Sequence, residues 1–136
     1  MRLICGLVLC IATVAVRADV VAVVSAKSSV TALSKNQVAD IFLGKTVRYP
    51  NGMQAVPIDQ VEGSAARTEF YSIYASKSPA QLKAHWSKII FTGRGKPPAA
   101  VANSVEARKL IAADTRAISY IDRSAVDSSV RIPMEP

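Results

Sequence analysis

The run from Val20 to Val24 constrains the fold more than any other stretch of this sequence. It reads Val-Val-Ala-Val-Val, so apolar side chains fall on both faces of a strand. A strand that is apolar on both faces is typical of a parallel or mixed sheet that other elements cover on both sides. The sequence therefore predicts a sheet of this kind, with this strand buried inside it.

A strong helix-start signal follows this strand. Ser34 and Gln37 have the spacing of a capping box, in which each of the two side chains satisfies a backbone amide of the first turn. The pattern predicts a helix that starts at Ser34 and stops at Gly44, because glycine tolerates the left-handed conformation that ends many helices. Its predicted apolar face contains Val38, Ile41 and Phe42.

Three more helices are predicted further along the chain. Each begins with a serine at the N-cap, and in one case a proline follows at the first helical position, where proline is favoured. The predicted starts are Gly63-Ser64, Ser78-Pro79 and Ser104, and the first of these helices ends near Ala75. The predicted apolar stripes are Phe70, Ile73 and Tyr74, then Leu82, Trp86, Ile89 and Ile90, then Val105, Leu110 and Ile111.

Short apolar runs predict the remaining strands. The turn signal Tyr49–Gly52 precedes a strand over Gln54–Ile58, in which Pro57 predicts an edge position or an early end. Two terminal strands are predicted over Ile118–Ile121 and Val130–Ile132. Strands that alternate with amphipathic helices indicate an α/β fold, here a single layered domain with a mixed sheet flanked by helices.

Residues 1–18 have the pattern of a secretory signal peptide. Arg2 is followed by an apolar run from Leu3 to Val16 and then by Arg17 between two small residues. Such a run is too short for the roughly 20 apolar residues of a membrane-spanning helix. We therefore expect cleavage before residue 19, export from the cytoplasm, and one domain over residues 19–136. An uncleaved N-terminal anchor is the alternative.

The composition argues against several classes of function. Cys5 and Cys10 both lie in the predicted signal peptide and His85 is the only histidine, so neither a metal site nor a Ser-His-Asp triad finds support. The net charge of +7 favours anionic partners. Because the basic residues are scattered rather than grouped with aromatic ones, nucleic acid is not an expected partner. We expect neither an enzyme nor a protein with a metal or other cofactor.

Three segments carry motifs that occur together, in the same order, in a known protein family. Leu33–Lys45 has a Leu-Ser start, a glutamine and an Ile-Phe-x-Gly-Lys end, Ile58–Arg67 is a strand-to-helix turn with Gly-Ser, and Ala117–Ile121 is a strand with a tyrosine. In this order they resemble the phosphate-type substrate-binding proteins of ABC transporters, which have the type 2 periplasmic-binding fold. Family members of usual size have two lobes, and this chain has room for only one. The resemblance therefore implies a single lobe that works in the periplasm.

The resemblance also implies a ligand, phosphate or a similar small oxyanion. A helix N-terminus leaves backbone amides unpaired and carries partial positive charge, so an oxyanion can accept several hydrogen bonds there. Gly63, Ser64, Ala65 and Arg67 are the predicted ligand-binding residues. The turn departs from the family pattern, because Gln60 stands in place of an arginine and alanines replace the following Gly-Thr. The alternative is that Ser64 only caps its own helix and that Arg67 is solvated.

Two other segments offer weaker candidates. The loop Thr92–Pro98 could help to hold an anion but has the composition of a flexible solvated loop, and Asp122 and Asp127 are expected to cap turns. Two functions therefore stay open. One is a solute-binding module for a phosphate transporter, binding weakly as one lobe or more tightly as a homodimer. The other is a non-transport accessory or protein-interaction module that keeps the fold without tight ligand binding. The protein partners considered are the membrane subunits of an ABC transporter or another periplasmic protein.

Overall fold

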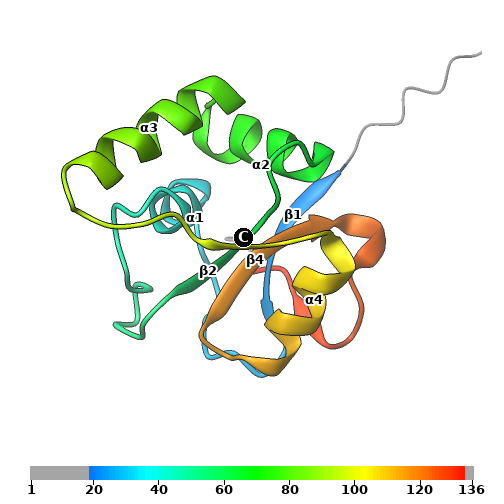
Figure 1. Ribbon diagram of the computed structural model, residues 1–136. Coiled ribbons are helices and arrows are strands. Elements are labelled where there is room, and N and C mark those ends of the chain that lie inside the picture. Colours follow the sequence, from blue (N-terminus) through cyan, green and yellow to red (C-terminus); the bar gives the residue numbers. More distant parts are fainter. Residues whose placement is uncertain (1–18, 134–136) are drawn as a thin grey trace, which may run out of the picture.

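The computed structural model describes residues 19–133, so the predicted signal peptide lies outside the described residues (Figure 1). Its strands are β1 (Val20–Ser25), β2 (Val56–Gln60), β3 (Ala99–Val101), β4 (Ala117–Asp122) and β5 (Val130–Arg131). Its α-helices are α1 (Lys35–Phe42), α2 (Ala65–Ala75), α3 (Pro79–Phe91) and α4 (Ser104–Ala113), and a short 3-10 helix covers Arg123–Ala125. The predicted starts and ends of most elements are met within two residues.

The strands form one five-stranded mixed sheet in the order β3-β2-β4-β1-β5. β2 runs parallel to both β3 and β4, whereas β1 pairs antiparallel with β4 and with β5. The register of the central pair joins Val20 to Asp122 and Val24 to Ile118. The predicted α/β class, with a mixed sheet, is therefore confirmed.

Helices cover both faces of the sheet, as the apolar run in β1 predicts. In Figure 1, α1, α2 and α3 lie on one side of the sheet and α4 lies on the other. Side chains alternate along β1, so that Val20, Ala22 and Val24 pack in the core beneath α1, α2 and α3. Val21 and Val23 pack in the second core with residues of α4. All six residues of β1 are buried, which makes it the central element of both cores.

The first helix has the local signals that the sequence predicts. Ser34 is its N-cap, and the capping box with Gln37 is complete in both directions. Gly44 follows the helix with a φ of +73°, which is the left-handed stop. Because these interactions involve neighbours in the chain, the sequence is sufficient to predict them.

Replacing Gly44 by alanine is expected to lower the free energy of unfolding by about 1–2 kcal/mol. A Cβ atom at this position would strain the left-handed backbone and would lie 3.0 Å from Cη2 of Trp86. Gly52→Ala is the control, because Gly52 has a φ of +86° but nothing within 4 Å of its added Cβ. Urea denaturation of both variants separates the two effects. Equal losses at the two positions would contradict a contribution from Trp86.

The prediction for Pro57 is wrong, and the structure gives the reason. β2 extends to Gln60 and lies between β3 and β4, so it is neither an edge strand nor a strand that ends early. However, its ladder with β3 begins only at Ile58. Pro57 is tolerated because, at this residue, β2 pairs only with β4, so no ladder with β3 is interrupted by the missing amide. The exposed edge strand β3 was not predicted at all, since it has only three residues.

Three predicted apolar stripes are also corrected. In α3, Ile90 is 54% exposed. In α2, Ile73 is 44% exposed and Tyr71 takes its place in the core. In α4, Val105 and Leu110 are exposed, and the buried face consists of Ser104, Ala107 and Ile111. The N-cap of α4 is Asn103 rather than Ser104, because the Asn103 side chain accepts the hydrogen bond from the amide of Glu106. Tyr71 and Ser104 thus reach the core from positions that the predicted apolar stripes do not include.

Candidate anion-binding site

The predicted site lies at the edge of the sheet where the parallel strands end. β2, β3 and β4 run in the same direction, so their carboxyl ends meet at this edge, and α2 and α4 begin directly after β2 and β3. Ligands of open α/β sheets bind at such carboxyl ends. Within the predicted segment Gly63 and Ala65 are exposed and Ser64 and Arg67 are half-buried, so the turn is open to solvent.

Ser64 is the N-cap of α2, as the alternative interpretation holds. Its hydroxyl accepts a hydrogen bond from the amide of Arg67 at 3.0 Å and donates one to Oε1 of Gln60 at 3.2 Å. The one hydroxyl hydrogen is therefore used inside the protein. The backbone amides of Gly63 and Ala65, in contrast, donate to no acceptor within residues 19–133. The turn offers main-chain donors to an anion, while the serine side chain holds the turn in place.

Arg67 is anchored rather than free in solvent. One terminal nitrogen donates to the carbonyl oxygen of Gln60 at 3.1 Å and lies 3.8 Å from a carboxylate oxygen of Asp59. The guanidinium also lies over the ring of Tyr71, 5.7 Å from its centroid. Its side chain is 23% exposed. These contacts fix the direction of the guanidinium and leave its other N–H groups able to reach a ligand.

Behind Arg67 lies a buried polar network centred on Asp59, which is 2% exposed. The hydroxyl of Tyr71 donates to one carboxylate oxygen at 2.6 Å, and the hydroxyl of Tyr120 donates to the other. Burial, and then the nearby charge of Asp59, raise the pKa of both tyrosines well above the usual value, so both hydroxyls stay protonated as donors. Sequence reasoning missed Asp59, although an acidic residue inside an apolar strand is a signal of a buried charge.

Gln60 joins the N-termini of two helices. Its side-chain nitrogen donates to the Ser104 hydroxyl at the start of α4 and to the carbonyl oxygen of Tyr120, each at 3.2 Å. Its side-chain oxygen accepts the hydroxyl of Ser64 at the start of α2. The resemblance places an arginine at this position, but the glutamine is 2% exposed and therefore supports the turn instead of meeting a ligand.

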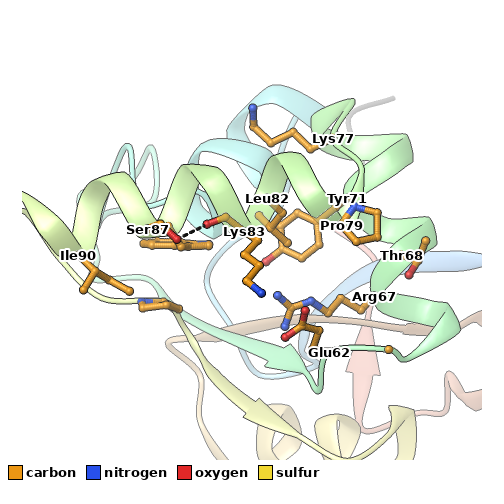
Figure 2. A pocket seen from close by; sticks show the side chains of 13 residues that line it. Glu62, Arg67, Thr68, Tyr71, Lys77, Pro79, Leu82, Lys83, Ser87 and Ile90 are labelled. Carbon is orange, nitrogen blue, oxygen red and sulfur yellow. Dashed lines mark hydrogen bonds between the residues drawn. The ribbon is translucent and has the colours of Figure 1, made fainter.

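A cavity of about 220 Å³ opens beside this turn, between α2 and α3 (Figure 2). Of the predicted site residues, Gly63 and Arg67 line it, whereas Ser64 and Ala65 do not. The other lining residues are Glu62, Thr68, Tyr71, Lys77, Pro79, Leu82, Lys83, Trp86, Ser87, Ile90 and Pro97. Lys83 was not predicted, because it reaches the cavity only through the packing of α3 against α2. Lys77, in the linker between these two helices, was not predicted either.

The polar end of this cavity is positively charged. In Figure 2 the side chains of Glu62, Arg67 and Lys83 point toward one another. Lys77 and Lys83 form no salt bridge with any carboxylate in residues 19–133, and Asp59 already faces Arg67. This end of the cavity therefore holds two cationic side chains and one acidic one, because Lys77 points away from them in Figure 2. An anion that enters would meet cations whose charges are only partly compensated.

The remaining candidates have structural roles. His85 lies 2.8 Å through Nε2 from the carbonyl oxygen of Leu43 and packs edge-on against Trp86. Asp127 accepts hydrogen bonds from the amide and hydroxyl of Ser129, as a turn cap does. The loop Thr92–Pro98 contributes only Pro97 to the cavity. In the described part of the chain, no three His, Cys, Asp or Glu residues are grouped as a metal site would require.

Sequence comparison gives no relative, because neither a family model nor a curated protein matches the chain. Comparison with solved structures, in contrast, gives clear matches. A protein described as a phosphate ABC transporter substrate-binding protein, solved with bound phosphate from Clostridium perfringens, matches 86% of this chain with a TM-score of 0.68 at 21% identity. An ABC-type phosphate transport receptor from Vibrio cholerae matches 84% with a TM-score of 0.65 at 19% identity. PstS from Borrelia burgdorferi matches 85% with a TM-score of 0.64 at 11% identity.

The fold is that of one lobe of a PstS-like binding protein. The chain spans 46%, 44% and 46% of these three structures, which is about half the length of each. The first two are named as a substrate-binding protein and a transport receptor, not as enzymes. The resemblance seen in the sequence motifs is thus confirmed at the level of the fold. In the described residues, no helix has the length and apolar character needed to cross a membrane.

Proposed function

We propose that this protein is an extracytoplasmic solute-binding module that holds phosphate or a similar small oxyanion beside the N-terminus of α2. The observation that carries the proposal is the cavity in which Gly63 and Arg67 meet Lys83 at the carboxyl end of β2. The fold supports it, because structures named for phosphate binding share it. Transport through ABC membrane subunits and a periplasmic location are parts of the same proposal.

Each group of the site would contribute in its own way. The free amide of Gly63 donates to the oxyanion, and the partial positive charge of the helix N-terminus favours it. Arg67 is already oriented by Gln60 and Asp59, so its remaining N–H groups bind without a large loss of side-chain freedom. Lys83 adds a charge from α3 on the other side of the cavity. One lobe supplies only one wall, so we expect weak binding unless a second copy supplies the other.

The test is a titration of the purified protein with inorganic phosphate, followed by NMR and calorimetry. We expect the amide resonances of residues 63–67 to shift at millimolar phosphate. Lys83→Gln should weaken binding about tenfold, because it removes a charge-assisted contact. Lys88→Gln, on the same helix but outside the cavity, should leave binding unchanged. An unchanged spectrum at residues 63–67, or equal effects of the two variants, would remove the proposal.

A second function, protein interaction, is favoured by one observation. Phe91 at the end of α3 is 92% exposed, and Ile90 beside it is 54% exposed. Neighbouring exposed apolar side chains of this kind are common in contact surfaces. If the protein binds no anion but Phe91→Ala releases a defined periplasmic partner, this second function replaces the first.

A further inference from the structure

The cavity between α2 and α3 has two chemically different ends. The charged side chains Glu62, Arg67 and Lys83 converge near Gly63 (Figure 2). The rest of the wall is largely apolar and comes mostly from α3. Its apolar members include Pro79, Leu82, Trp86, Ile90 and Pro97. A bare inorganic anion would use the first end and would leave the second end without a partner.

The size of the cavity indicates what else could enter. A cavity of about 150 Å³ lined by apolar side chains is enough to hold one benzene ring. The cavity here measures about 220 Å³. It therefore has room for an anionic group together with an apolar group of about the size of one ring. Because small-molecule sites combine an apolar wall with a few convergent polar groups, this composition is typical of a site for an organic ligand.

The wall that would contact the apolar group is already held in place. Leu82 and Trp86 are buried on the inner face of α3, and Trp86 packs against Gly44. Tyr71, which also lines the cavity, is fixed by its hydrogen bond to Asp59. Binding would then require little reordering of side chains at this end, which lowers its entropic cost.

From this arrangement we propose that the ligand is a phosphate monoester or a phosphonate that carries an apolar group of about one ring. Its phosphate lies at Gly63, Arg67 and Lys83, and its apolar group lies against Leu82, Trp86 and Ile90. This inference rests on the proposed oxyanion site and specifies its ligand class.

Three probes test the inference by calorimetry: phenyl phosphate, inorganic phosphate and phenol. We expect phenyl phosphate to bind about tenfold more tightly than inorganic phosphate, because its ring leaves water when it enters the cavity. Phenol should bind more weakly than phenyl phosphate, since it has no anionic group. Trp86 is the only tryptophan, so its fluorescence should change with phenyl phosphate and report the location of the ring.

A matched pair of variants on α3 tests where the ring binds. Ile90→Ala trims a lining residue that is already half exposed, so the fold is not at risk, and it should remove most of the advantage of phenyl phosphate. Phe91→Ala is the control, because Phe91 is exposed and lies outside the cavity. Neither variant should change the binding of inorganic phosphate.

The outcomes separate this inference from the proposed function. If inorganic phosphate binds and phenyl phosphate binds no more tightly, the organic ligand is excluded and the oxyanion site stands. If neither phosphate compound binds, both proposals fail. Phenol binding as tight as that of phenyl phosphate, or equal effects of Ile90→Ala and Phe91→Ala, would also overturn the inference.

Discussion

Replacing Asp59 by alanine is expected to lower the free energy of unfolding by about 3–5 kcal/mol. The carboxylate is buried and accepts hydrogen bonds from the hydroxyls of Tyr71 and Tyr120 and from the amide of Gln60. Its loss would leave buried donors without their acceptor and would remove the negative charge facing Arg67. A buried network of this kind is costly when one member is removed, because water cannot replace it.

Urea denaturation of the variant measures this effect, with two comparisons. Glu106→Ala removes a carboxylate from an exposed pair with Lys109 and should change stability by less than about 1 kcal/mol. Tyr71→Phe should be less destabilising in the Asp59→Ala background than in the original protein, because its hydroxyl has then already lost its acceptor. If the two losses simply add, or if Asp59→Ala resembles Glu106→Ala, the network does not stabilise the fold as described.

The protein is also expected to lose stability steeply above about pH 10, the range in which tyrosines of the unfolded chain ionise. Tyr49, Tyr71 and Tyr120 are buried, and burial is the largest cause of a raised pKa in each. Because the folded pKa exceeds the unfolded one, the stabilisation is fully present below pH 10. It falls as the pH rises, since only the unfolded state releases the protons. Three such groups predict a slope of about 4 kcal/mol per pH unit.

Unfolding curves at a series of alkaline pH values give this slope, and tyrosinate absorbance shows which state ionises. Tyr49→Phe serves as the control variant, because Tyr49 donates to the carbonyl oxygen of Arg116 and takes no part in the Asp59 network. It should reduce the slope by about 1.4 kcal/mol per pH unit. If all three tyrosines ionise while the protein is still folded, the predicted slope is wrong.

Local signals made most of the fold predictable from the sequence. The capping box at Ser34, the left-handed stop at Gly44 and the Ser78-Pro79 helix start are all as predicted, because neighbours in the chain determine them. The buried strand at Val20 was predictable for a related reason, since its composition allows only an interior position. The burial of side chains that pack against another element depends instead on residues far apart in the sequence.

Tertiary contacts explain what the sequence did not predict. Tyr71 is buried in place of Ile73 because its hydroxyl meets Asp59, twelve positions earlier in the chain. Lys83 joins the candidate site because α3 packs beside α2, a contact without any local pattern. Of the predicted ligand-binding residues, Gly63 and Arg67 line the cavity, whereas Ser64 caps its helix. The ligand-binding roles of all these residues stay predictions.

The pairing of β1 has a consequence for when the sheet can form during synthesis of the chain. β1 is the first of the described strands to emerge from the ribosome, yet its two sheet neighbours, β4 and β5, are the last two of them. Until then the backbone of β1 has no strand to pair with, and the cores on both faces of the sheet lack the residues of β4 and β5. Distant pairing of this kind delays folding. The sheet around β1 would therefore not form on a nascent chain before β4 has been made.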